Sequence, residues 1–286
     1  MIDTLKTPGG NYAMLALDQR EALRDMFPRQ GSGEPVLDVT LRAFKALAVR
    51  ELAPYSSGVL LDRGLGLPNG RPDSIPRSKG LIVAVDALDQ DFGGPVRHTT
   101  VDATITPEYL REVGAAAIKF LVIWRAGARR SENRESTQRV VELAREAGVA
   151  SLVEGIVRTD DDSPFESPEA RDAAILAAAE DLMQLRPDLY KAEVPGNRPG
   201  DQSRVTEQSK LMSDIVGGDW VVLSNGVLPE DFAEAVRRAV AGGAKGFLAG
   251  RAIWADTLRE PNAHELLQTR SVERLKNLTA IVDSPR

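Results

Sequence analysis

The segment DLYKAEVP, residues 188–195, places a lysine in the middle of a short, mostly apolar run and a glutamate two residues after it. Buried strands usually exclude lysine, because a buried ammonium costs free energy unless it is paired. Lys191 therefore has two interpretations. It forms an ion pair, most simply with Glu193, which alternation along a strand places on the same face, or it supplies an interior amine that attacks a carbonyl carbon and forms an imine.

Two more ionisable residues interrupt apolar runs, Lys119 within AAIKFLVIW (116–124) and Glu154 within ASLVEGIV (150–157). If these runs are consecutive strands, Lys119 and Lys191 can share one layer of side chains, and each ammonium then disfavours the charge on the other. An uncharged lysine amine is a nucleophile. Glu154 is then the counter-ion of both lysines, or the acid/base group that carbon–carbon cleavage through an enamine requires, and these two roles are compatible.

The elements that must position these residues form a regular series. Eight apolar runs occupy residues 12–18, 57–62, 80–86, 116–124, 150–157, 188–195, 219–226 and 245–250, and amphipathic stretches lie between most of them. Strands that are apolar on both faces, each followed by a helix, are typical of a parallel sheet covered by helices. Eight of them predict an α/β fold, a (β/α)8 TIM barrel, with residues 1–286 as a single domain. The Gly- and Pro-rich stretch 63–79 predicts a loop in place of a helix.

Active sites of such barrels form at the carboxyl ends of the strands. The predicted strand ends carry an unusual number of polar residues: Asp18, Gln19, Asp62, Asp86, Lys119, Glu154, Lys191, Glu193, Ser224, Asn225, Gly250 and Arg251. The last two strands end in LSNGV (223–227) and LAGRAIW (248–254), where phosphate commonly meets outward-pointing backbone N–H groups. Small residues there let an anion approach the backbone, and Arg251 adds a guanidinium, so we expect an anion site.

Composition excludes several classes of function. The formal net charge of −6 argues against binding nucleic acid or an acidic membrane surface. The chain has no cysteine and two histidines, so disulfides, thiolate catalysis, Cys-ligated metals and a three-histidine zinc site are excluded. The N-terminal MIDTLKTPGG does not have the pattern of a signal peptide, and no run approaches the roughly 20 apolar residues of a membrane span. We expect a cytoplasmic protein.

The chain resembles a known family. The similarity runs in register from about residue 9 to residue 283, through the blocks GGNYAMLALDQREALRDMF, YSSGVLLD, AIKFLVIWR, DLYKAEVP, VVLSNGV and GFLAGRAIW. These blocks are similar to the class I aldolases of the tagatose-1,6-bisphosphate aldolase type, and within that group to the sulfofructosephosphate aldolases. The compact length and the LVIWR block favour the sulfosugar members. Asn225 departs from the family pattern, which has a small residue there.

The resemblance implies a TIM barrel that needs no metal or other cofactor and has a ketose phosphate as its substrate. It implies Lys191 as the Schiff-base lysine, Glu154 as the acid/base, and substrate contacts from Lys119, Asp18 and Gln19, with an anionic end group held by Ser224, Asn225, Gly226, Gly250 and Arg251. A second anion pocket is expected near Arg125 or the Asp18–Arg20 segment. For Asp18, a structural role as a helix N-cap is the alternative.

The implied reaction is cleavage of 6-deoxy-6-sulfofructose 1-phosphate to dihydroxyacetone phosphate and 3-sulfolactaldehyde, a step of sulfosugar breakdown. Three alternatives stay open: an aldolase for tagatose or fructose 1,6-bisphosphate, a class II zinc aldolase, and a barrel that binds sugar phosphate without turnover. Barrels of this kind often associate, and we expect a homo-oligomer.

Overall fold

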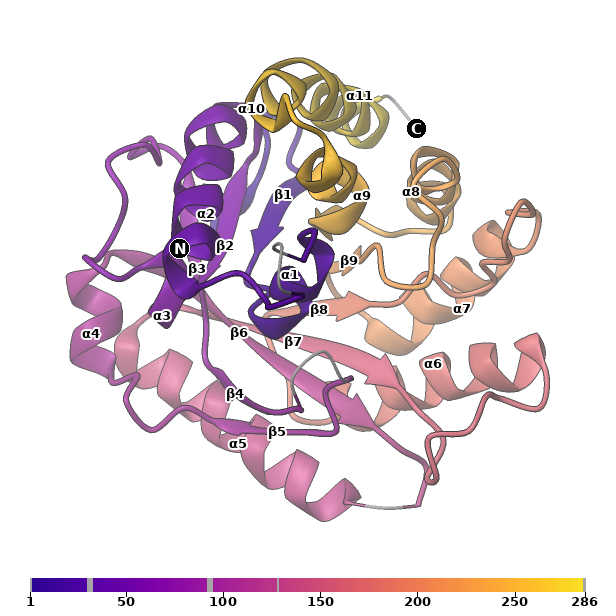
Figure 1. The fold of residues 1–286 in the computed structure, drawn as a ribbon. Coiled ribbons are helices and arrows are strands. Elements are labelled where there is room, and N and C mark those ends of the chain that lie inside the picture. The colour runs from indigo at the N-terminus through magenta and orange to yellow at the C-terminus, as the bar shows by residue number, and fades with distance from the viewer. Residues whose placement is uncertain (1, 30–32, 92–94, 128, 285–286) are drawn as a thin grey trace.

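The strands close into a parallel barrel, as the sequence predicts. The computed structural model describes residues 2–29, 33–91, 95–127 and 129–284. The barrel runs in the order β1-β10-β9-β8-β7-β6-β3-β2, and all neighbours are parallel (Figure 1). Its strands are β1 (Tyr12–Leu17), β2 (Gly58–Asp62), β3 (Gly80–Ala84), β6 (Ala115–Trp124), β7 (Ala150–Val157), β8 (Leu189–Ala192), β9 (Trp220–Val222) and β10 (Gly246–Ala249).

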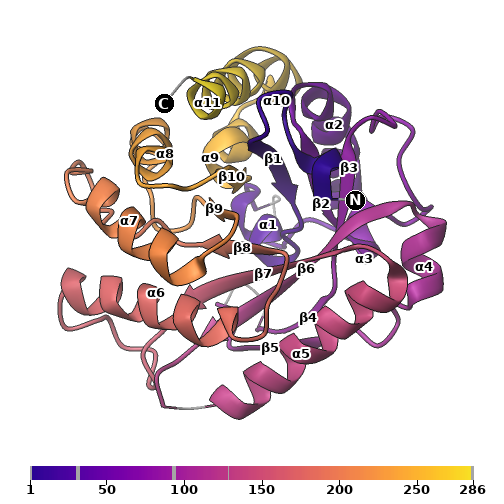
Figure 2. The same ribbon diagram turned by 180° about the vertical axis from the view of Figure 1, so that it is seen from behind.

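Most helices lie around the outside of the barrel, whereas the short first helix lies over its open end (Figure 2). The helices are α1 (Glu21–Met26), α2 (Asp38–Leu52), α3 (Arg63–Gly66), α4 (Pro107–Glu112), α5 (Arg130–Ala147), α6 (Pro168–Met183), α7 (Val205–Val216), α8 (Phe232–Ala241), α9 (Arg251–Trp254), α10 (Ala263–Leu266) and α11 (Val272–Asp283). Ser167 caps α6 by accepting a hydrogen bond from the Ala170 N–H, and Gly148 ends α5 with a φ of +73°. Between β2 and β3 the structure has only the four-residue α3, in agreement with the predicted loop. No helix of the described ranges has the length and apolar character needed to cross a membrane.

Apolar side chains fill the amino-terminal half of the barrel interior. This cluster includes Ala117 of β6, Leu152 of β7 and Leu189 of β8, together with Leu5 from a 3-10 turn (Ile2–Leu5). Side chains alternate along a strand, so the residue two positions after each of these also points inward. Those residues are Lys119, Glu154 and Lys191, which form the next layer toward the carboxyl ends.

One element was not predicted from the sequence. The expected strand 80–86 ends at Ala84, and Asp86 begins a separate antiparallel hairpin of β4 (Asp86–Asp89) and β5 (His98–Val101). The hairpin packs on β6, where the Thr99 hydroxyl donates a 2.5 Å hydrogen bond to the Leu121 carbonyl.

Strands β6 and β7 are longer than their neighbours. They pair over eight positions, from Ala117 opposite Ala150 to Trp124 opposite Val157, whereas β8 and β9 have four and three residues. The two long strands therefore project past the rim of the barrel and, with the hairpin, form a wall on one side of its mouth (Figure 1). As a result Lys119 and Glu154 lie inside their strands, where the sequence had suggested strand ends.

Candidate active site

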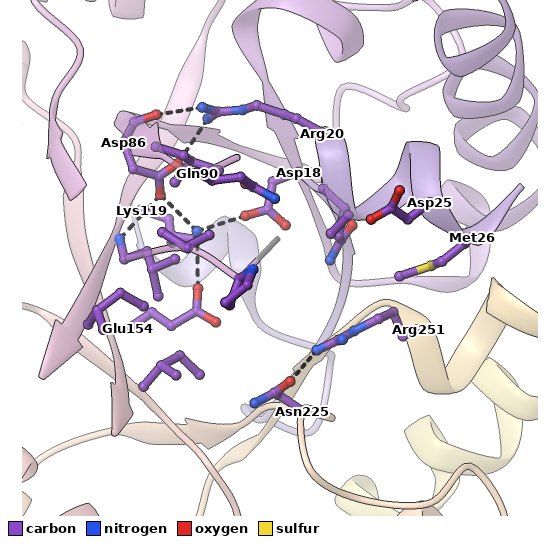
Figure 3. A pocket seen from close by; sticks show the side chains of 18 of the residues that line it. Asp18, Arg20, Asp25, Met26, Asp86, Gln90, Lys119, Glu154, Asn225 and Arg251 are labelled. Atoms are coloured by element: carbon purple, nitrogen blue, oxygen red, sulfur yellow. Dashed lines mark hydrogen bonds and ion pairs between the residues drawn. The ribbon is translucent and has the colours of Figure 1, made fainter. Parts of the chain in front are cut away.

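Two buried lysines and three carboxylates meet at the mouth of the barrel (Figure 3). Lys119 Nζ lies 2.7 Å from Asp18 Oδ2, 2.9 Å from Asp86 Oδ2 and 3.1 Å from Glu154 Oε2. Lys191 Nζ lies 3.0 Å from the other oxygen of the same glutamate, Oε1. All five side chains line a cavity of about 510 Å³. The structure thus brings the predicted lysines into one layer, with Glu154 between them.

The charge state of Lys119 differs from the expectation. Burial alone would lower the pKa of Lys119, but Asp18, Asp86 and Glu154 outweigh it and hold that pKa well above its ordinary value. The expectation that this amine loses its charge to the neighbouring lysine is therefore wrong, because it overlooked the carboxylates that converge on the amine. Lys119 is a fixed positive charge.

The pKa values of Glu154 and Asp18 are both lowered. Burial would raise the pKa of Glu154, but the ammonium groups of Lys119 and Lys191 more than offset it and keep that pKa below its ordinary value. The pKa of Asp18 is lowered for the same reasons, since both lysines outweigh its burial. At neutral pH both side chains can accept a proton.

These depressed pKa values give a prediction about acid stability. A carboxylate whose pKa is lower in the folded than in the unfolded state stabilises the fold above its unfolded pKa, and that stabilisation is lost as pH falls through the folded value. We expect the free energy of unfolding of the wild type to exceed that of Glu154→Gln most at pH 7, and the difference to shrink below the ordinary glutamate value of 4.5. Urea unfolding of both proteins between pH 7 and pH 3 measures this, and a difference that grows on acidification would contradict it.

Glu193 does not pair with Lys191. It lies beyond the last residue of β8, where the alternation of the strand no longer holds. Its carboxylate accepts hydrogen bonds from the Val157 N–H (2.9 Å), Arg171 Nη2 (2.8 Å) and Asn225 Nδ2 (3.1 Å). Lys191 does form an ion pair, as one interpretation predicted, but its partner is Glu154 and not Glu193.

Two of the residues expected to bind an anion lie in the cavity. Asn225 and Arg251 line the cavity, and Arg251 Nη2 donates a 2.5 Å hydrogen bond to Asn225 Oδ1. Ser224, Gly226 and Gly250 are not among the lining residues. Strand packing alone explains the glycine at position 250, because a Cβ atom there would lie 2.4 Å from the Ala16 carbonyl oxygen.

Arg125 does not reach the cavity. Its guanidinium donates to the Thr159 carbonyl and, at 2.7 Å, to Asp162 Oδ1, so it joins the loops that follow β6 and β7. The predicted role of Arg125 in substrate binding is therefore not supported by its position. Gln19 does line the cavity, and its Oε1 is buried without a hydrogen-bond partner in the described part of the chain.

Sequence reasoning missed two residues of the site. Asp86 was counted among the polar strand ends, but no function was predicted for it. Its carboxylate accepts hydrogen bonds from both Arg20 Nη2 (2.9 Å) and Lys119 Nζ, so Arg20 helps to hold the carboxylate that binds Lys119. Arg158 lines the cavity one residue past β7. Alternation along the strand could have identified Arg158, because residues 154, 156 and 158 share one face. That inference requires knowing that the strand extends to Val157. Within the described ranges, no group of three or more His, Asp or Glu side chains is arranged to hold a metal ion.

The chain is similar to known aldolases. A family model described as DeoC/LacD family aldolase matches residues 12–256. The chain is 27% identical to tagatose 1,6-diphosphate aldolase 2 of Enterococcus faecalis, covering 98% of this chain and 92% of that protein, and 26% identical to tagatose 1,6-diphosphate aldolase of Streptococcus agalactiae, covering 98% and 94%.

Solved structures show the same fold. An archaeal fructose 1,6-bisphosphate aldolase superposes with a TM-score of 0.67 at 17% identity, over 99% of this chain and 97% of the other. A structure of an archaeal fructose-1,6-bisphosphate aldolase with its catalytic lysine covalently bound to a carbinolamine intermediate gives a TM-score of 0.66 at 16% identity, over 99% and 98%.

Proposed function

The chain belongs to the DeoC/LacD family of aldolases and is a class I aldolase, and from this premise we propose that Lys191 forms the Schiff base and that the substrate is 6-deoxy-6-sulfofructose 1-phosphate. One observation carries the assignment of the lysine. Lys191 is buried in the cavity with Glu154 as its single salt-bridge partner in the described chain, whereas Lys119 is bound by three carboxylates. Of these two cavity lysines, Lys191 is the one whose amine a single proton transfer would free.

The first steps form the covalent intermediate. Lys191 Nζ gives up a proton, for which Glu154 Oε1 lies within reach at 3.0 Å, and attacks the C2 carbonyl of the ketose. Glu154 then returns this proton to the carbinolamine hydroxyl, which leaves as water, so that an iminium and an ionised Glu154 remain. An archaeal aldolase of the same fold forms such a carbinolamine on its own catalytic lysine, which supports this step for Lys191.

The next steps break the carbon–carbon bond. The iminium nitrogen draws in the electron pair of the C3–C4 bond while Glu154 accepts the C4 hydroxyl proton, and the aldehyde leaves. The enamine is then protonated at C3, and water hydrolyses the iminium to release dihydroxyacetone phosphate and the free amine. In this scheme Asp18 and Gln19 bind substrate hydroxyls, and the fixed charge of Lys119 holds Asp18 and Glu154 in place.

Two features favour the sulfosugar phosphate as the substrate: the LVIWR block and the compact length, both of which the chain shares with the sulfofructosephosphate aldolases. The sulfosugar phosphate carries an anion at each end, and Asn225 and Arg251, which line the cavity, are the proposed contacts for one of them. The alternative is tagatose or fructose 1,6-bisphosphate, which the names of the relatives at 26–27% identity favour.

The deciding experiment is a side-by-side assay of 6-deoxy-6-sulfofructose 1-phosphate, tagatose 1,6-bisphosphate and fructose 1,6-bisphosphate, with borohydride trapping and peptide mapping of the adduct. We expect the largest kcat/KM with the sulfosugar, an adduct on Lys191, and activity that EDTA does not change. Faster turnover of a bisphosphate would refute the substrate, and an adduct on another lysine would refute the role of Lys191. Complete failure of trapping would favour a barrel that binds sugar phosphate without turnover.

We also propose that residues 1–286 act as one catalytic domain, that the protein forms a homo-oligomer and that it works in the cytoplasm. Sedimentation of the purified protein tests the oligomer directly.

A further inference from the structure

Two partly buried arginines line the cavity without a salt bridge to a carboxylate in the described ranges, Arg158 and Arg251. The Arg158 side chain makes one hydrogen bond there, from Nη1 to the Val157 carbonyl at 2.8 Å, and Arg251 makes one, to the neutral amide of Asn225. Of the other arginines near the barrel mouth, Arg20 is paired with Asp86 and Arg171 with Glu193, and Arg259 is exposed.

Arg158 and Arg251 line the same cavity, and each disfavours the charge of the other. Burial lowers the pKa of Arg251, the carboxylates of Glu154, Asp18 and Glu193 act against this, and Arg158 acts with it. Partly buried like charges that share a cavity are favourable sites for an anion. Since neither guanidinium forms a salt bridge within the described ranges, both can donate hydrogen bonds directly to a bound anion.

Asn225 explains how Arg251 is held without being neutralised. Its Oδ1 accepts a hydrogen bond from Arg251 Nη2 (Figure 3). Its amide Nδ2 donates to Glu193 Oε1, so the asparagine bridges the carboxylate and the guanidinium. Glu193 itself is fixed by Arg171 and by the Val157 N–H. A small residue at position 225, as in the family pattern, would leave Arg251 without this support, and a carboxylate there would neutralise it.

The wall at the barrel mouth fixes the position of Arg158. Arg158 follows β7 in the inward series that begins with Glu154 and continues with Ile156, because alternate residues share a face. Ile156 packs with Ile123 and Leu223, and Val96 beside the hairpin packs against that cluster. The Val157 N–H that binds Glu193 is in the residue just before Arg158. Both arginines therefore depend on one connected set of contacts.

We propose that Arg158 is a specificity-determining residue that, together with Arg251, binds one terminal anion of the substrate, and that Asn225 is a positioning residue which orients Arg251 for this pair and leaves its charge intact. The inference rests on the proposed function, since it assumes a ketose with a terminal sulfonate or phosphate. Both groups offer three oxygens to two guanidinium forks, the geometry in which arginine binds tetrahedral anions well.

The test measures kcat and KM for the sulfosugar phosphate and for tagatose 1,6-bisphosphate with Arg158→Met, Arg158→Lys and Asn225→Asp. Loss of a charged hydrogen-bonding group is expected to raise KM about tenfold or more, with a smaller change in kcat because the anion lies away from the reacting carbons. Lysine should recover part of the loss, because it keeps the charge without the fork. Arg139→Met, an exposed arginine on α5, is the matched control and should leave both constants unchanged.

A second measurement identifies which end of the substrate Arg158 and Arg251 bind. Dihydroxyacetone phosphate carries only the C1 phosphate, so the concentration that half-saturates its borohydride trapping reports that end alone. If Arg158→Met raises this concentration together with the ketose KM, the pair holds the C1 phosphate; if only the ketose KM rises, the pair holds the far anion. Both results support the proposal.

The proposal is overturned if Arg158→Met and Asn225→Asp leave the ketose KM and the trapping unchanged in a protein that melts like the wild type. That outcome differs from failure of the proposed substrate, in which wild type cleaves the bisphosphate faster and the arginine variants still raise its KM. Binding of neither ketose to the wild type would overturn both.

Discussion

Replacing Lys191 by methionine is expected to reduce aldol cleavage by roughly 10⁴-fold or more and to abolish borohydride trapping of dihydroxyacetone phosphate. Covalent catalysis replaces one difficult step by several easier ones, and none of these steps can take place without the nucleophile. Methionine keeps an unbranched apolar stem of similar length, so the layer above Leu189 stays filled. The measurement is single-turnover cleavage of the proposed substrate, with mass spectrometry of the reduced protein.

The control is Lys210→Met, which removes an exposed lysine of α7 and should leave cleavage and trapping unchanged. Thermal unfolding of the Lys191 variant should stay close to that of the wild type, because Glu154 keeps its second ion pair with Lys119. A Lys191→Met protein that is folded and still cleaves at the wild-type rate would end the assignment of this lysine.

The fold was accessible from sequence because its signals are local and repeated. Each barrel strand is a short apolar run, and helix ends carry typical capping residues, Ser167 at the start of α6 and Gly148 at the end of α5. The β4–β5 hairpin was not predicted, because the segment GLIVAVDALD is a mostly apolar run that continues past Ala84 without a turn signal. The break there is imposed by partners distant in sequence: the Val85 N–H donates to the Lys119 carbonyl, and the Val85 carbonyl accepts from the Asp102 N–H.

The site was predictable as far as alternation along a strand holds. Lys119, Glu154 and Lys191 each lie inside a strand, and their convergence followed from the period of two. Arg125 and Glu193 lie just past strand ends, where backbone direction depends on the following loop, and their predicted positions were wrong. The charge on Lys119 was missed for another reason: it depends on Asp18 and Asp86, which approach from different strands.

The ion pairs indicate different roles for Lys119 and Lys191. Lys119 holds Asp18, Asp86 and Glu154 at distances of 2.7–3.1 Å, and its raised pKa keeps it charged through any turnover at neutral pH. Glu154 can therefore accept and release a proton without losing its position, because one of its oxygens stays bound to Lys119 while the other faces Lys191. Such a fixed geometry suits a group that must serve first as a base and then as an acid.

Glu154→Gln is accordingly expected to lower kcat by about 10²–10⁴-fold, the usual contribution of a general acid/base group. Glutamine has nearly the same shape, and its amide oxygen can still accept a hydrogen bond from Lys119, but it cannot take the C4 hydroxyl proton. Unlike Lys191→Met, this variant should still yield the borohydride adduct with dihydroxyacetone phosphate, although more slowly, since the nucleophile is intact and water can take its proton in place of Glu154. Rapid-quench kinetics of cleavage, run beside the trapping assay, measure both.

The contrast between the two variants separates a proton-transfer role of Glu154 from a purely electrostatic one. If Glu154 only kept the lysines in place, Glu154→Gln would impair trapping and cleavage by the same factor. If it transfers the proton, cleavage falls far more than trapping, and Glu154→Asp, which keeps the charge on a shorter stem, recovers part of the rate. Equal losses in both assays, or cleavage by Glu154→Gln at the wild-type rate, would move the proton-transfer role to another residue of the cavity, of which Asp18 is the nearest ionised carboxylate to Lys119 at 2.7 Å.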